Sequence, residues 1–388
     1  MLSKHSSREI IVKTMAGMEE ILAQELKGLG AQNIQVLNRA VKAEANKKTI
    51  YRINLSSYFA LRVLLPIRQD TVHNEDQLYY SVKRINWTEL ISPDQTIAVR
   101  SAVKSDYFSN SHYVELKTKD AIVDQFTARM GKRPDVDLEE PDLSVNIHIY
   151  KNALTISLDS SGDSLHKRGY RISATVAPIN EVLAAGLIKL SNWNYYDKFI
   201  DPMCGSGTFL AEAIMQKLNM PPQHMNRNFS FKKWQDYDEN LWEEVVGEAM
   251  EAQRTDDNFK VYGTDLHSKA IESAEYNLSE AGILQYAELE VRDFHSYNET
   301  KNAHLIFNPP YDLRIESDDI IEEYKKIGDT LKQKFISSQA WIISGNIDAL
   351  KRVGLRPSKK FNMMNGPIES KFHKFEMYAG SKKAKYNK

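Results

Sequence analysis

Residues 201–209 have the sequence Asp-Pro-Met-Cys-Gly-Ser-Gly-Thr-Phe and lie between two apolar runs, 195–200 and 209–214. The first run predicts a buried parallel strand and the second predicts a helix. Gly205 and Gly207 allow the connecting turn to bend sharply and allow a ligand to approach the main chain closely. A carboxylate at the strand end and free N–H groups at the helix start suit a ligand with both cationic and hydroxyl or carboxylate groups. We therefore expect a ligand site at this turn.

A second stretch, Asn308-Pro309-Pro310-Tyr311, follows the apolar run 305–307. Two more predicted strands end in acidic residues, one at Asp265 and one just before Asp293-Phe294. In a doubly wound sheet, ligands bind at the carboxyl ends of the central strands. A carboxylate at Asp265 suits the two hydroxyls of a ribose, and Asp293 suits the amino group of an adenine on which Phe294 packs. A single Gly-x-Gly is weak evidence, but this ordered set of strand ends is far more specific.

The C-terminal half alternates strands and helices, which is typical of a parallel sheet covered on both faces. A helix over 177–191 opens this half, and residues 220–240 form an aromatic-containing insertion. The Asn365-Gly366 pair predicts a hairpin, so we expect the sheet to end antiparallel. The seven predicted strands span residues 198–200, 260–262, 287–291, 304–307, 340–344, 359–363 and 372–378.

The N-terminal half mixes strands and helices without a nucleotide loop, which predicts an α+β binding module. A turn-rich boundary follows at residues 160–164. We expect three domains, at residues 1–65, 66–162 and 163–388. The predicted elements are strands at 10–15, 67–72 and 96–103, a strand or hairpin in 34–45, a hairpin at 143–158, and helices at 18–29, 57–64, 77–90 and 116–130.

The composition is that of an ordinary globular protein, with 388 residues, 27% charged residues and a net charge of −1. No apolar run approaches the roughly 20 residues that span a bilayer, and no secretory leader is visible. The single cysteine, Cys204, excludes an internal disulfide framework and a zinc cluster built from cysteines. We therefore expect a cytoplasmic protein without a membrane partner, in which Cys204 fills a tight loop.

Two other nucleotide-binding patterns fit less well. In the dinucleotide fingerprint a third glycine is expected where Leu210 stands, and the acidic residue is expected about 20 rather than 60 positions further on. A phosphate-binding P-loop is excluded because no Gly-Lys-Ser/Thr follows the turn.

The chain resembles THUMP-containing RNA methyltransferases with a class I S-adenosylmethionine-dependent domain. Residues 201–209 and 308–311 are similar to motifs I and IV of enzymes that methylate exocyclic amino groups, although Asp312 stands where a glycine is expected. The closest resemblance is to the 23S rRNA guanine-N2 methyltransferase family, whose members are often labelled N6-adenine-specific DNA methylases. The other similar stretches are residues 51–55, 62–64, 117–124, 131–134, 157–162, 165–171 and 365–369.

This resemblance implies a seven-stranded Rossmann-like methyltransferase domain that follows a ferredoxin-like and THUMP RNA-binding region. It implies S-adenosylmethionine as the cofactor, RNA as the partner and no metal. The expected cofactor-binding residues are Asp201, Pro202, Cys204, Gly205, Ser206, Gly207, Thr208, Asp265, Leu266, Asp293 and Phe294. The expected catalytic residues are Asn308, Pro309, Pro310 and Tyr311, and the expected RNA contacts are Lys117, Lys119, Arg129, Lys132, Arg133, Lys167, Arg168 and Arg171.

Four other functions stay open at this point. Two keep the chemistry but change the substrate, to guanine N2 in tRNA or to adenine N6 in DNA. A third is methylation of a protein glutamine, because the Asn-Pro-Pro-Tyr motif also serves such enzymes. The fourth is a non-catalytic RNA-binding factor with a vestigial pocket, against which the intact Asp201, Asp265 and Asn308 argue.

Overall fold

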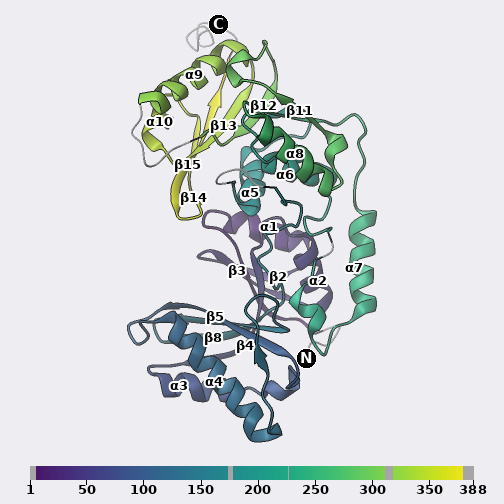
Figure 1. Cartoon of the computed structure of the whole chain (residues 1–388), viewed down its shortest axis with the longest axis vertical. Helices are drawn as coiled ribbons and strands as arrows, with labels where there is room; N and C mark the ends of the chain where they lie inside the picture. The colour runs from purple at the N-terminus through teal and green to yellow at the C-terminus, as the bar shows by residue number, and fades with distance from the viewer. Residues whose placement is uncertain (1–5, 174–177, 226, 311–317, 379–388) are drawn as a thin grey trace. The chain divides into compact units, whose positions relative to one another are not determined.

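The computed structural model describes residues 6–173, 178–225, 227–310 and 318–378 (Figure 1). The chain forms two compact units. Unit 1 contains residues 1–14, 22–165 and 226–248, and unit 2 contains residues 15–21, 166–225 and 249–388.

Unit 2 contains a seven-stranded sheet in the order β11-β10-β9-β12-β13-β15-β14. The pairs from β11 to β13 are parallel, whereas β15 is antiparallel to both β13 and β14. The seven predicted strands and the antiparallel end of the sheet are therefore confirmed. The strands are β9 (Lys198–Asp201), β10 (Val261–Asp265), β11 (Ala287–Val291), β12 (Ala303–Phe307), β13 (Gln339–Ser344), β14 (Lys359–Asn365) and β15 (Ile368–Glu376).

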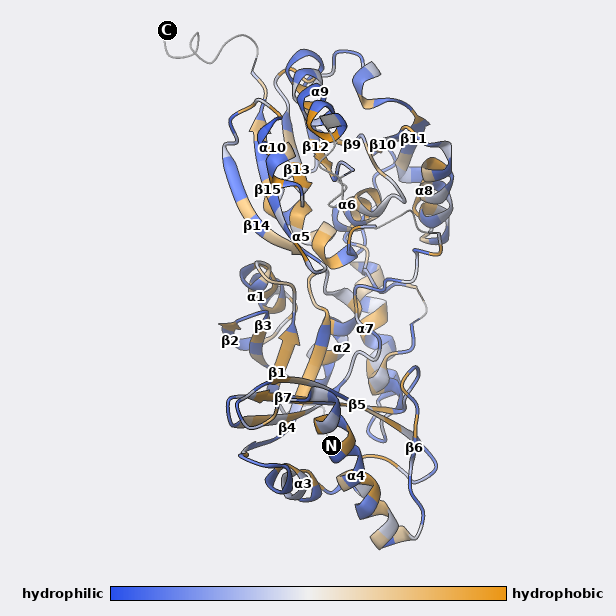
Figure 2. Ribbon diagram, turned by 60° about the vertical axis from the view of Figure 1, so that its left-hand side comes forward, coloured by the Kyte–Doolittle hydropathy of each residue, from blue (hydrophilic) through white to orange (hydrophobic). Residues whose placement is uncertain are grey.

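Two helices of unit 2, α5 and α10, begin at an asparagine that caps the first turn. Asn180 caps α5 by accepting a hydrogen bond from the Leu183 N–H, so this helix starts four residues later than the sequence predicts. Strands β12 and β13 are almost entirely buried, whereas the edge strand β14 carries hydrophilic residues (Figure 2). The helices are α5 (Glu181–Ser191), α6 (Thr208–Leu218), α8 (Ser268–Glu280), α9 (Asp318–Lys334) and α10 (Ile347–Lys351), with short 3-10 turns η3 (Leu284–Tyr286) and η4 (Phe294–Ser296).

Unit 1 contains an eight-stranded sheet in the order β2-β3-β1-β4-β8-β7-β5-β6. The long strand β4 pairs with β1 on one side and β8 on the other, and the predicted boundary between residues 65 and 66 lies inside this strand. The predicted hairpin at 143–158 is confirmed as β7 and β8. The strands are β1 (Arg8–Lys13), β2 (Gln32–Leu37), β3 (Ala40–Ala45), β4 (Arg62–Thr71), β5 (Thr96–Lys104), β6 (Asp135–Val136), β7 (Leu143–Tyr150) and β8 (Ala153–Asp159).

One predicted helix of the N-terminal half, at residues 57–64, is wrong. The helix lies earlier, at α2 (Lys47–Ser56), because the Asn46 side chain accepts a hydrogen bond from the Thr49 N–H and caps its first turn. Ser57 ends α2 in an extended conformation, and β4 begins at Arg62. The remaining helices preceding the insertion are α1 (Glu19–Gly28), α3 (Glu75–Lys83), the 3-10 turn η1 (Trp87–Glu89) and α4 (Ser111–Met130).

The aromatic insertion contains the 3-10 turn η2 (Ser230–Lys233) and leads into helix α7 (Glu239–Glu251), and residues 226–248 belong to unit 1. The Tyr51 ring on α2 stacks on Phe231 at a centroid distance of 4.4 Å. The Lys48 Nζ forms ion pairs with Glu244 at 2.6 Å and Glu248 at 2.7 Å. A segment that lies between β9 and β10 in sequence is therefore packed against the first half of the chain.

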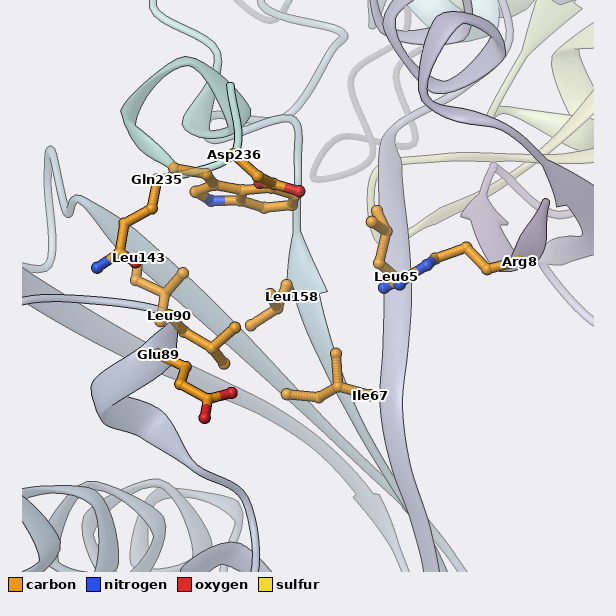
Figure 3. Close-up of a pocket in the computed structure, with 10 residues that line it drawn as sticks. Arg8, Leu65, Ile67, Glu89, Leu90, Leu143, Leu158, Gln235 and Asp236 are labelled. Atoms are coloured by element: carbon orange, nitrogen blue, oxygen red, sulfur yellow. The ribbon is translucent and has the colours of Figure 1, made fainter. Parts of the chain in front are cut away.

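Residues of the insertion and of the sheet of unit 1 line a pocket (Figure 3). Apolar side chains of strands β4, β7 and β8 line it, among them Leu65, Leu143 and Leu158. Charged groups of Arg8 and Asp236 also border it. Within the described ranges, no helix has the length and hydropathy to cross a bilayer.

Candidate active site

The two motif loops of unit 2 leave neighbouring parallel strands. Strand β9 pairs with β12 so that Ile200 lies opposite Leu305. Asp201 ends β9, and Asn308 comes directly after the end of β12. Because these strands are parallel, both loops begin at the same edge of the sheet. The strand order also reverses between β9 and β12, which is where doubly wound sheets bind ligands.

The glycine turn is tied to the end of strand β10. The Gly205 N–H donates to Asp265 Oδ2 at 3.0 Å, and the Cys204 N–H donates to the Thr264 carbonyl at 2.9 Å. Gly205 and Gly207 have positive φ angles of 54° and 82°, as the sharp bend requires. A Cβ added at Gly207 would come within 3.1 Å of the Ala274 Cβ on α8. The turn is thus held tightly between β10 and α8.

Asp201 places a carboxylate at the start of this turn. It is 2% exposed, and its Oδ1 accepts a hydrogen bond from the Met203 N–H at 3.2 Å. Burial raises the pKa of Asp201 well above its usual range, and the nearby Asp265 raises it further. A cationic group bound here would offset both effects, because an opposite charge favours the ionised carboxylate.

Asp265 ends β10 and is partly exposed. Its Oδ1 accepts the His267 N–H at 3.0 Å while its Oδ2 accepts the Gly205 N–H. A carboxylate has about four acceptor positions, so capacity for a diol remains. The adjacent Leu266 side chain is 64% exposed, which leaves an apolar surface beside this carboxylate.

Asp293 and Phe294 lie at the end of β11 in different environments. Asp293 is exposed, and its Oδ1 accepts the His295 N–H at 2.8 Å. Phe294 is only 3% exposed and packs in the core beside Phe307 and Phe335. In this structure the Phe294 ring is packed against other aromatic rings, and the expected stacking of this ring on a ligand stays a prediction.

The other predicted residues of the turn are buried and serve its internal contacts. The Pro202 carbonyl accepts the Thr264 hydroxyl at 3.2 Å, and the Thr264 hydroxyl also contacts the Tyr297 hydroxyl at 3.1 Å. Burial raises the pKa of the Cys204 thiol well above its usual range, which keeps it neutral. Ser206 and Thr208 are both buried.

Asn308 presents an oxygen that is buried without a hydrogen-bond partner among the described residues. Such an acceptor costs free energy unless a donor reaches it, so a donor group bound at this strand end would stabilise it. Pro309 is buried and Pro310 is exposed. Tyr311 lies outside the described residues.

Two of the three basic residues predicted at 167–171 are engaged inside unit 2. The Arg168 guanidinium is fully buried and pairs with Glu212 at 3.2 Å. Arg171 donates to the Thr208 hydroxyl at 2.9 Å and pairs with Glu181 at 3.3 Å. The expectation that Arg168 contacts RNA does not fit this structure, because a fully buried cation with its own carboxylate cannot reach a phosphate. Arg171 is only partly buried, and its contact with RNA stays a prediction. Lys167 is exposed.

The five basic residues predicted in unit 1 lie on α4 or just after it. These residues make weak interactions at the protein surface. The Lys117 ammonium lies 5.4 Å from the Tyr79 ring centroid, and Lys132 pairs with the exposed Asp94. Exposed ion pairs contribute only about 0–1 kcal/mol, so phosphates can compete for these cations. The remaining three are Lys119, which pairs with Asp120, Arg129, which contacts Asn86, and the exposed Arg133.

Comparison with protein families matches three consecutive parts of the chain. Residues 9–64 match the RlmL ferredoxin-like domain and residues 72–159 match the THUMP domain. Residues 168–374, more than half of the chain, match the RMKL-like methyltransferase domain. The chain belongs to this methyltransferase family. The expected fold, an α/β methyltransferase domain that follows a ferredoxin-like and THUMP region in the sequence, is confirmed.

Relatives of this methyltransferase cover almost its whole length. A Synechocystis protein named "Putative RNA methyltransferase" is 37% identical over 96% of this chain and 98% of its own length. A Clostridium difficile protein described as "a possible methylase" has a TM-score of 0.87 at 31% identity, covering 97% of this chain and all of its own. SMU.472, solved in complex with SAH, has a TM-score of 0.85 at 29% identity, covering 97% and 99%.

The donor set at the strand ends fits S-adenosylmethionine, the cofactor of this class of methyltransferase. The sulfonium and ammonium groups are cations suited to a buried carboxylate such as Asp201, and the ribose diol suits a carboxylate such as Asp265. The structure also reveals two residues that the sequence did not single out, Asn277 on α8 and Tyr297 after η4. Neither lies in a recognisable motif, so only their contacts to the turn and to Thr264 identify them.

Proposed function

We propose that this methyltransferase transfers a methyl group from S-adenosylmethionine to the exocyclic amino group of a base in RNA, guanine N2 of 23S rRNA. The family assignment and the THUMP domain support an RNA methyltransferase. The resemblance of the whole chain to the 23S rRNA guanine-N2 enzymes supports the finer choice of base and substrate.

The Asn308 oxygen, which has no hydrogen-bond partner in the part of the chain that the structure describes, is the observation that carries the proposal. An exocyclic amine is a poor nucleophile because its lone pair is delocalised into the ring. If Asn308 Oδ1 and the Pro309 carbonyl accept its two hydrogens, the nitrogen becomes pyramidal and its lone pair is directed at the methyl group. The Pro-Pro pair stiffens this loop because proline fixes φ.

S-adenosylmethionine supplies an electrophilic methyl group on a sulfonium. The carbon–sulfur bond breaks as the carbon–nitrogen bond forms, and the amine then loses a proton to solvent. We assign the ammonium side of the cofactor to Asp201, the ribose to Asp265 and the adenine edge to Asp293 and Leu266. Holding donor and acceptor in line supplies roughly 7–11 kcal/mol of the barrier, so the chain's main task is positioning.

Unit 1 is assigned to RNA binding. A base-modifying enzyme must extract its target nucleotide at a cost of a few kcal/mol, and contacts elsewhere on the RNA offset that cost. Lys117, Lys119, Arg129, Lys132 and Arg133 are the proposed phosphate contacts, and Lys167 is a further candidate in unit 2.

The substrate is tested by incubating the protein with labelled S-adenosylmethionine and separately purified rRNA, tRNA and DNA, followed by nucleoside analysis. We expect label in N2-methylguanosine from 23S rRNA. Label in tRNA guanosine alone would show that tRNA is the substrate in place of 23S rRNA. Label only in N6-methyladenine from DNA would overturn the proposal. No label in any nucleic acid, with intact cofactor binding, would favour a non-catalytic RNA-binding factor.

The role of Asn308 is tested by Asn308→Ala, with Asn298→Ala in an exposed loop as the matched control. We expect turnover of Asn308→Ala to fall by roughly 100-fold or more, the usual effect of removing one oriented polar group at the reacting atoms. The dissociation constant for S-adenosylhomocysteine should stay within about twofold of wild type, because Asn308 is not assigned to the cofactor. Equal loss of turnover and cofactor binding would show that this role is wrong.

A further inference from the structure

Asn277 lies in the last turn of helix α8 and is 1% exposed. Its Oδ1 accepts hydrogen bonds from the Ile172 N–H at 3.1 Å and the Ser173 N–H at 3.0 Å. Its Nδ2 donates to the Ser173 carbonyl at 2.7 Å and to the Ser206 carbonyl at 3.0 Å. An amide side chain has two donors and two lone pairs, so the hydrogen-bonding capacity of Asn277 is fully used.

All four of these bonds go to main-chain groups of two segments that are distant in sequence. Ser206 lies in the glycine turn, and residues 172–173 lie in the segment of unit 2 that begins directly after Leu165. Ala274, three residues before Asn277 on the same face of α8, packs against Gly207. Helix α8 therefore contacts the turn at two adjacent points.

The same stretch, residues 168–173, is bound to helices α6 and α8 by further contacts. Arg171 donates to the Thr208 hydroxyl at the start of α6, and Arg168 pairs with Glu212 within α6. The Ser173 hydroxyl contacts the Ser273 hydroxyl at 2.9 Å. The stretch that the sequence suggested as an RNA contact thus supports the cofactor side of unit 2.

We propose that Asn277 is a positioning residue of the cofactor site. By holding the Ser206 carbonyl, it fixes the peptide orientation of the glycine turn, and with it the direction of the N–H groups at the start of α6. The same amide also holds residues 172–173, so a change in the conformation of the turn should change the conformation of those two residues as well. This inference rests on the proposed cofactor role of the turn.

The first test is Asn277→Asp, which keeps the acceptor oxygen and replaces the two donor hydrogens with an acceptor facing two carbonyls. We expect the dissociation constant for S-adenosylhomocysteine and the KM for S-adenosylmethionine to rise about tenfold or more. Turnover at saturating cofactor should stay within about threefold of wild type. The matched control is Ser273→Ala, which contacts Ser173 but not the turn, and which should leave both constants within about twofold.

A merely structural role would lower the amount of active protein and so lower turnover without changing the dissociation constant. That outcome, in a variant with a wild-type circular dichroism spectrum, would overturn the proposal.

The second test uses the wild-type protein and so does not depend on folding of a variant. Hydrogen exchange is measured with and without S-adenosylhomocysteine. We expect the amides of Ile172 and Ser173 to gain protection together with those of the glycine turn. Protection of the turn without Ile172 and Ser173 would contradict the role of Asn277. If the turn itself gains no protection although the ligand binds, the proposed cofactor site is wrong.

Discussion

Gly207 combines a left-handed backbone with a close helix contact, and both depend on the absence of a side chain. Its φ is 82°, and an added Cβ would lie 3.1 Å from the Ala274 Cβ. Ala274 is fully buried in α8 and has little freedom to move away. A side chain here would therefore disturb both the conformation of the turn and its distance from α8.

We predict that Gly207→Ala lowers the free energy of unfolding by about 1–2 kcal/mol, because an L-residue in the left-handed region is strained by about that amount. It should also weaken binding of S-adenosylhomocysteine. Urea unfolding and calorimetry measure the two effects. The control is Gly247→Ala within α7, where a new Cβ meets nothing within 4 Å and where alanine should stabilise the helix slightly. Similar behaviour of the two variants would contradict the strain argument.

Strand β12 is joined to helix α5 through a buried histidine. His304 Nε2 lies 2.8 Å from the Ser191 hydroxyl at the end of α5. Its Nδ1 is buried without a partner among the described residues. Burial, together with a smaller effect of the nearby Lys374 charge, lowers the pKa of His304 to about 3. The imidazole is therefore neutral in the folded protein at any ordinary pH.

This depressed pKa makes the packing of β12 on α5 sensitive to acid. Between pH 6.5 and pH 3 the unfolded chain protonates this histidine and the folded chain does not, so the free energy of unfolding falls as pH falls, by up to about 1.4 kcal/mol per unit. We predict that unfolding at pH 7 and pH 4.5 shows a fall in stability that is about 2 kcal/mol smaller in His304→Gln than in wild type. An identical fall in the two proteins would show that His304 does not contribute.

At the scale of the whole molecule, the net charge is only −1, but the acidic and basic groups of the candidate sites lie in different units. The strand-end carboxylates lie in unit 2, whereas the exposed lysines and arginines of α4 and the following loop lie in unit 1. If these cations hold RNA phosphates, binding releases counterions and weakens as salt increases.

We predict that replacing both Lys132 and Arg133 with alanine reduces the slope of log affinity against log salt concentration by about two, one for each lost phosphate contact. Filter binding of 23S rRNA fragments at several salt concentrations measures this slope. The control is Lys351→Ala on α10, an exposed lysine paired with Asp348, which should leave the slope unchanged. Weaker binding with an unchanged slope would mean that neither residue contacts a phosphate.

The sequence by itself determined the strands of unit 2 and the groups at their ends. Strand runs, the Asn365-Gly366 hairpin and the glycines of the turn are local signals, because backbone preferences and side-chain periodicity act over a few residues. Asp201, Asp265 and Asn308 could therefore be placed at strand ends. The helix at residues 47–56 also has a local signal, because Asn46 caps its first turn. Its position therefore did not depend on long-range packing, although the sequence analysis does not predict it.

Only the tertiary structure decided which of these groups lie close together and which charged side chains are buried. Strand β9 pairs with β12 across more than 100 residues of sequence, which brings the two motif loops to one edge. The sequence places Arg168 among the expected RNA contacts, whereas the structure buries it against Glu212. Asn277 lies in no sequence motif, and only its hydrogen bonds identify it. Such outcomes depend on long-range packing, because the environment of a buried polar group is made by segments that are distant along the chain.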